Sequence, residues 1–253
     1  MNDSIFKNTN DFGHREAREN GDVNEFLKVL KSRRSVRVFK QELLPESEVL
    51  SIIKDGLKAP NSSNLQPWQF LWVRSKEKKE ALSKACFGQN GAKTASDLIV
   101  CVARTDTWKI NSLELLNILQ MQGPVPNTVK HYYTKIVPFA YGGIGFLSPL
   151  KWLFITLAGI LRMVPREPIW PSQLKTWAIK STALACENIM LSARARGFDS
   201  LPMEGYDSKR VRKILNLHKH QHIVMIIALG HGAEDGIYGP QIRLDQDKFI
   251  TKI

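Results

Sequence analysis

One stretch organises this sequence: Lys31-Ser32-Arg33-Arg34-Ser35-Val36-Arg37-Val38-Phe39. It places four cations and two hydroxyls within nine residues and ends on a hydrophobic side chain. Arginine side chains bind phosphate in a bidentate manner, and a serine hydroxyl completes such a shell. The stretch therefore indicates a phosphate site. A basic run on its own is more often a solvated turn or a nucleic-acid patch, so the rest of the chain has to decide between these interpretations.

The composition is typical of a globular protein except for its charge. The 253 residues are 43% hydrophobic and 24% charged, which is enough to bury a substantial core. The net charge of +12 favours contact with an anionic partner: nucleic acid, an acidic membrane face or a phosphorylated ligand. The three cysteines, Cys86, Cys101 and Cys186, have no metal-type spacing, which predicts buried free thiols and a reducing cytoplasm.

Hydrophobic periodicity predicts a mixed α/β (α+β) fold. We expect a first helix with Val23, Phe26, Leu27 and Leu30 on one face and a second between Pro45 and Pro60. Further helices are expected at 77–87, 108–120 and about 172–196, and another after a turn at 201–205; strands are expected at 69–73, 98–103 and 223–229. The long helix is rich in apolar and small residues, which indicates a buried central helix against the sheet. We expect residues 1–21 to form a polar arm and residues 22–253 to form a single domain with an insertion at about 132–171.

Three further segments explain the basic stretch. They are Ala59-Pro60-Asn61-Ser62-Ser63-Asn64-Leu65-Gln66-Pro67-Trp68, Pro202-Met203-Glu204-Gly205-Tyr206-Asp207, and the tail that carries Arg243. Together with Arg33–Phe39, and in this order, they resemble the motifs of the nitroreductase family of FMN-dependent oxidoreductases. The resemblance runs from about Val23 to the C-terminus, apart from the segment near 132–171. It implies a nitroreductase-like central mixed or antiparallel sheet packed by helices, in a homodimer.

The resemblance also implies a role for each motif. Arg33, Arg34, Ser35 and Arg37 match positions that hold the FMN phosphate and ribityl chain, and Arg243 matches a further phosphate ligand. Pro60, Asn61, Ser62 and Asn64 match a loop that covers the flavin of the partner subunit. Pro202, Met203, Glu204 and Gly205 would lie along the isoalloxazine, with a backbone N–H near flavin N5. Gln241 stands where the family has a lysine, and Gln89 is a candidate for contact with the pyrimidine edge.

The function implied by the resemblance is hydride transfer from NADH or NADPH, through flavin N5, to an electron-poor acceptor by a ping-pong mechanism. The acceptor is a nitroaromatic, a quinone or an enone. Hydride chemistry belongs to the cofactor, so no catalytic side chain is predicted, and no metal. The His218-Lys219-His220-Gln221-His222 run lacks acidic or cysteine company and is interpreted as a surface turn. Two alternatives use other features: a non-catalytic flavin-binding or membrane-surface-binding protein on the same fold, and nucleic-acid binding, which only the charge supports.

An apolar segment lies within the insertion. Residues 144–164 are strongly apolar, with Lys151, Arg162 and Arg166 among and beyond them. This is marginal against the roughly 20 residues that span a bilayer. Three interpretations compete: a lid or dimer-face helix over the flavin, which we favour; an interfacial helix resting on anionic lipid, a peripheral membrane contact that the basic flanks favour; and a true span, which would interrupt a soluble fold.

Overall fold

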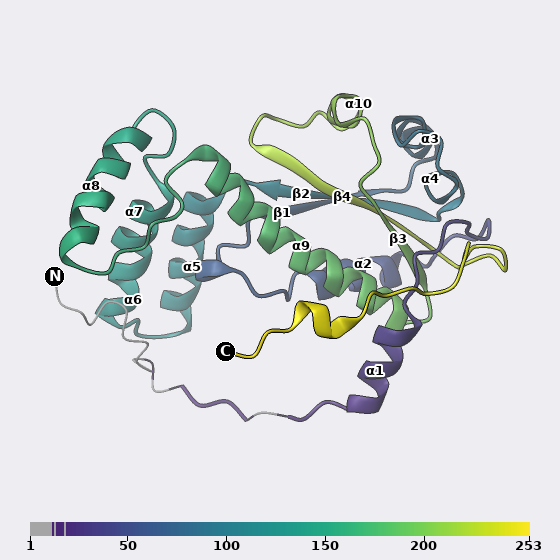
Figure 1. Ribbon diagram of the computed structural model, residues 1–253, viewed down its shortest axis with the longest axis horizontal. Helices are drawn as coiled ribbons and strands as arrows, with labels where there is room; N and C mark the ends of the chain where they lie inside the picture. The colour runs from purple at the N-terminus through teal and green to yellow at the C-terminus, as the bar shows by residue number, and fades with distance from the viewer. Residues whose placement is uncertain (1–11, 13, 18) are drawn as a thin grey trace.

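The computed structural model describes residue 12, residues 14–17 and residues 19–253, so most of the predicted arm 1–21 lies outside the described residues. At its centre is a four-stranded sheet in the order β1-β2-β4-β3 (Figure 1). The strands are β1 (Trp68–Val73), β2 (Asp97–Arg104), β3 (Asp199–Met203) and β4 (Gln221–Gly230). All three neighbouring pairs are antiparallel. Of the two sheet types predicted, the antiparallel one is therefore correct.

Helices cover both faces of the sheet. Alternate residues of β2 point to opposite faces, because the side-chain period of a strand is two. Leu98, Val100 and Val102 pack on the side of α3 (Lys76–Ala85), α4 (Asn90–Thr94) and α10 (Ser208–Ile214). Ile99 and Cys101 pack on the side of α2 (Glu46–Gly56) and the long α9 (Pro171–Ala195). The predicted long helix against the sheet is confirmed, with one face buried. The three cysteines are free and buried, as predicted.

The helices α2 and α9 pack closely because α2 ends in a glycine. A Cβ atom at Gly56 would lie 2.5 Å from Cγ1 of Ile189. Beside this contact, Asp55 accepts hydrogen bonds from Ser192 at 2.7 Å and from Arg196 at 3.0 Å, and it pairs with Lys58 at 2.8 Å. These hydrogen bonds hold the pKa of Asp55 well below its ordinary value, and the one from Lys58 has the largest effect. The carboxylate therefore ties the two helices together.

Replacing Asp55 by asparagine should lower stability in a pH-dependent way. A carboxylate with a lowered pKa in the folded state stabilises the fold above its unfolded pKa, about 3.9, and loses that effect as the pH falls through the folded value. Because the site is partly exposed, we expect Asp55→Asn to cost on the order of 1 kcal/mol near neutral pH. The difference from the unmodified protein should shrink below about pH 4. Urea unfolding at a series of pH values measures this, and a constant difference would contradict the prediction.

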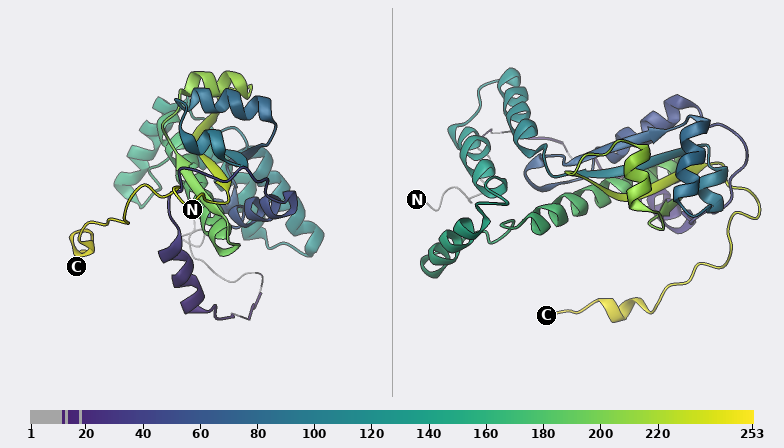
Figure 2. Two further views of the ribbon diagram at one scale, coloured as in Figure 1. Left: turned by 90° about the vertical axis from the view of Figure 1, so that its right-hand side faces the viewer. Right: turned by 90° about the horizontal axis from the view of Figure 1, so that it is seen from above.

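A group of helices extends from one end of the sheet and includes the predicted insertion. It comprises α5 (Trp108–Gln122), α6 (Asn127–His131), the π-helical turn η3 (Tyr132–Ile136), α7 (Val137–Tyr141) and α8 (Ser148–Leu161). Figures 1 and 2 show α8 at the far end of the molecule from α1 (Val23–Ser32) and α3. Within the described part of the chain, no helix combines the length and apolar character needed to cross a bilayer.

The segment after α9 differs from the prediction. Residues 201–205 were expected to form a turn, but residues 199–203 form strand β3, in which Pro202 lies opposite Ile227 of β4. A proline lacks the N–H that a central strand needs, so it is tolerated on an edge strand. β3 is such an edge strand in this sheet. The turn follows it at Glu204-Gly205.

Candidate functional site

The basic stretch runs in extended form along the edge of the sheet. Ser35 forms a parallel bridge with Ser200 of β3, and Phe39 forms an antiparallel bridge with Gly232. Val36 and Phe39 are buried, whereas Arg37 between them is exposed. A Cβ atom at Gly230 would lie 2.8 Å from the Phe39 ring, so a glycine at this position lets the ring sit against β4. The two apolar anchors therefore fix the stretch and turn its arginines outward.

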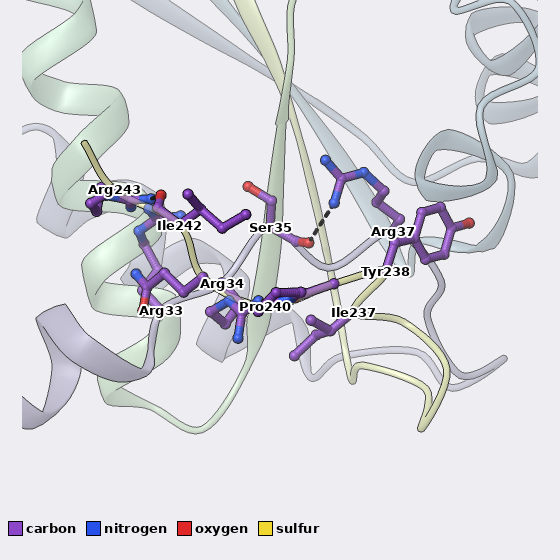
Figure 3. A pocket seen from close by; sticks show the side chains of 11 residues that line it. Arg33, Arg34, Ser35, Arg37, Ile237, Tyr238, Pro240, Ile242 and Arg243 are labelled. Atoms are coloured by element: carbon purple, nitrogen blue, oxygen red, sulfur yellow. Dashed lines mark hydrogen bonds between the residues drawn. The ribbon is translucent and has the colours of Figure 1, made fainter.

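The tail of the chain returns over this stretch and completes a hollow. The backbone N–H of Arg37 donates to the carbonyl of Gly236 at 2.7 Å. Arg34 donates to the carbonyl of Gly239. The hollow has a volume of about 550 Å³. Figure 3 shows the side chains that line it. It is lined by Arg33, Arg34, Ser35, Arg37, Ile237, Tyr238, Gly239, Pro240, Gln241, Ile242 and Arg243.

The hollow is strongly basic. Four arginines line it and no carboxylate does. Within the described residues, Arg33, Arg34, Arg37 and Arg243 form no ion pair with an acidic side chain. Other arginines do, for example Arg104 with Asp106 at 2.8 Å. Unneutralised guanidinium groups around a hollow of ligand size fit a phosphate-bearing molecule.

A chain of side-chain contacts connects the Glu204-Gly205 turn to this hollow. Gln89 donates from its side-chain amide to the carbonyl of Gly205 at 2.7 Å. The following residue, Asn90, donates to the hydroxyl of Tyr238 at 3.0 Å. The ring of Tyr238 in turn carries the Arg37 guanidinium, 5.4 Å from its centroid. The turn after β3, the start of α4 and the basic stretch thus form one continuous polar surface.

The Asn/Ser loop of residues 60–64 does not line this hollow. Its 3-10 turn η2 (Ser62–Asn64) packs against the helices of the insertion. The Oγ atom of Ser62 lies 3.1 Å from the hydroxyl oxygen of Tyr141, and the Oγ atom of Ser63 lies 2.7 Å from the hydroxyl oxygen of Tyr132. Asn61 shapes the loop, accepting from the backbone N–H of Gln66 at 2.8 Å. The side chain of Asn64 is exposed. A single chain therefore brings Arg33, Arg34, Ser35, Arg37 and Arg243 together but leaves this loop apart from them.

Sequence reasoning missed several parts of the site. Tyr238, Gly239 and Pro240 line the hollow beside Gln241. The Gly-Pro pair is a turn signal that marks where the tail changes direction, but nothing in the pattern shows which segment it returns to. A second hollow of about 670 Å³ was also not predicted. It lies between the start of α5, the loop before α8, the start of α9 and the start of β4, where His220 precedes the strand and His222 belongs to it.

Comparisons with known proteins identify the family and the fold of this chain. The sequence model described as "Nitroreductase family" matches residues 30–231. The chain is 28% identical over 218 residues to a protein named "NADH dehydrogenase" from Thermus thermophilus, a match that covers 86% of this chain and 91% of the relative.

Solved structures share the fold. One, from Exiguobacterium sibiricum and in complex with FMN, has a TM-score of 0.69 at 24% identity and covers 94% of this chain and all of that one. Another is CLA-ER, an enone reductase of gut-bacterial fatty acid saturation metabolism. It has a TM-score of 0.66 at 22% identity and covers 91% of this chain and 98% of that one.

Proposed function

Because the chain belongs to the nitroreductase family, we propose that it is an FMN-dependent oxidoreductase that uses NADH or NADPH to reduce an electron-poor acceptor. The observation that carries this proposal is the hollow at the basic stretch, where four arginines have no carboxylate partner among the described residues. The Thermus relative named as an NADH dehydrogenase and the FMN complex of the Exiguobacterium structure support the donor and the cofactor.

The residues of the chain would bind and orient the cofactor. Arg33, Arg34, Arg37 and Arg243 would hold the phosphate, with Ser35 completing the shell. Pro202, Met203, Glu204 and Gly205 would lie along the ring, with Gln89 fixing the turn through its bond to the Gly205 carbonyl. Bound FMN supplies the hydride chemistry, and the protein positions donor and acceptor against it. The acceptor would be a nitroaromatic, quinone or enone taken up in a ping-pong cycle; the enone reductase CLA-ER, which shares the fold, supports the enone class.

A homodimer would complete the site. The loop carrying Pro60, Asn61, Ser62 and Asn64 lies apart from the arginines of its own chain, so a second copy would have to supply it. Two exposed apolar surfaces near the arginines support this. They are the face of α1, which buries none of its residues, and the tail beyond Gln241 (Val23, Phe26, Leu27 and Leu30; Ile242, Leu244, Phe249 and Ile250). Exposed apolar surfaces of this extent mark interaction sites.

The visible spectrum of the purified protein tests the function. We expect a yellow protein, or one that becomes yellow with added FMN, whose flavin absorbance is bleached when NADH or NADPH is added anaerobically. Addition of a quinone or a nitroaromatic should then restore the absorbance. Sedimentation of the same preparation should give twice the mass of one chain.

Each outcome separates the alternatives. A protein that neither contains nor takes up FMN would overturn the proposed function. A yellow protein that neither nicotinamide bleaches would favour the non-catalytic flavin-binding alternative. A flavin-loaded monomer would show that residues 60–64 do not act on the site of a partner copy.

A further inference from the structure

Helix α8 exposes an apolar stripe to solvent. Ile155 and Ser148 are its buried residues, and Ser148 fixes the helix by donating to the carbonyl of Ile169 at 2.6 Å. The exposed positions repeat with helical spacing along another face: Leu150, Leu153, Phe154, Leu157, Ile160 and Leu161. Residues three, four and seven apart share one face of a helix. The stripe therefore points away from the body of the protein.

The apolar surface continues at both ends of the helix. Phe146 before it and Met163 after it are each 98% exposed, and Trp152 is half exposed. Monomeric proteins rarely expose apolar patches of this extent without a partner. Tryptophan and phenylalanine are also the aromatic side chains found where a helix lies in a membrane interface. The patch is thus built for an apolar partner.

The sequence around the patch is basic. Between Glu114 and Glu167 the sequence contains no aspartate or glutamate, but it contains Lys130, Lys135, Lys151, Arg162 and Arg166. All of these except Lys151 are exposed; Lys151 donates to the carbonyls of Ala140 and Gly142 and holds α8 to α7. Exposed cations beside an inserted apolar helix favour the negative surface of anionic lipid.

From this combination we infer that α8 docks the protein onto an anionic membrane surface, lying in the plane of the interface with its apolar stripe in the lipid. The helix has 14 residues, about 21 Å, and is too short to cross a hydrocarbon core of about 30 Å. The α8 region of a second copy is a poorer occupant, because it carries the same positive charge.

Vesicle sedimentation with the full-length protein tests the inference. We expect binding to phosphatidylcholine vesicles that contain phosphatidylglycerol, weaker binding to phosphatidylcholine alone, and a decrease as salt is raised. The double variant Leu153→Glu, Leu157→Glu should weaken binding at least roughly 100-fold, because two leucines leave the lipid and two anions replace them. The double variant Arg162→Ala, Arg166→Ala should weaken binding to the anionic vesicles by about 30-fold.

A matched control carries the same charge change on another exposed apolar site. Leu43 lies before α2 and Leu50 within it, and both are exposed. The double variant Leu43→Glu, Leu50→Glu should bind vesicles like the unmodified protein. Circular dichroism confirms that each variant is folded. Absence of binding to the anionic vesicles, equal binding to neutral ones, or an equal loss in the control would overturn the inference. So would an α8 variant that dissociates an oligomer while its vesicle binding is unchanged, since α8 would then contact a second copy.

Discussion

FMN retention should be lost when Arg33 and Arg37 are both replaced by alanine. Each guanidinium that binds a phosphate forms charge-assisted hydrogen bonds worth roughly 1.5–3 kcal/mol. Loss of two such contacts should weaken FMN binding roughly 100- to 10,000-fold. This pair is preferable to Arg34, because Arg34 also holds the tail through the Gly239 carbonyl, and its removal would disturb the hollow itself. Titration of apoprotein with FMN, followed by flavin fluorescence, measures the change.

The matched control removes two cations elsewhere. Lys209→Ala with Arg210→Ala changes the net charge equally but alters the exposed surface of α10, outside the hollow. FMN affinity should stay within a few-fold of the unmodified protein, since remote exposed charges are screened. If both double variants lose FMN equally, the effect is one of overall charge. If neither does, the phosphate binds elsewhere.

The largest loss of stability should follow replacement of Asp97 by asparagine. Asp97 is the first residue of β2, and its side chain is fully buried. It accepts hydrogen bonds from Trp72 Nε1 and from the hydroxyl of Ser96, both at 2.6 Å, and lies 3.6 Å from Nε of Arg74. Burial lowers the pKa of Lys79 nearby, and Asp97 opposes that shift. Loss of the carboxylate would remove the buried anion beside Lys79 and leave Arg74 paired with the exposed Glu46 at 3.3 Å, at a cost of about 3–5 kcal/mol.

Asp106→Asn provides the comparison for Asp97→Asn. Asp106 also pairs with an arginine, Arg104, at 2.8 Å, but on the surface. An exposed pair contributes about 0–1 kcal/mol. The free energies of unfolding, from urea titrations at neutral pH, should therefore differ clearly between the two variants. Equal losses would show that burial of Asp97 does not set its contribution.

The sequence alone determined most of the helices and strands and which residues are candidates for the site. The apolar residues Val36 and Phe39 among the arginines indicate a segment whose apolar side chains are buried while its arginines face outward. The unbroken apolar runs of β2 and β4 predict strands with both faces covered, because both faces need apolar side chains there. The spacing of the apolar residues of α9 predicts a long helix, and its bounds differ from those expected by a single residue. These are short-range patterns, so they can be read without knowing the fold.

Only the tertiary structure decided which segments meet. Arg243 is separated from Arg33 by most of the chain, and no local pattern shows that the tail returns to line the same hollow. Pro202 indicates a turn by propensity, yet its place on an edge strand follows from the strand order. The apolar pattern of α8 would be the same if its stripe faced a core, so the sequence does not show that the stripe faces solvent. Its outward orientation follows from the packing of Ile155 and Ser148, since long-range packing, rather than periodicity, determines which face of a helix is covered.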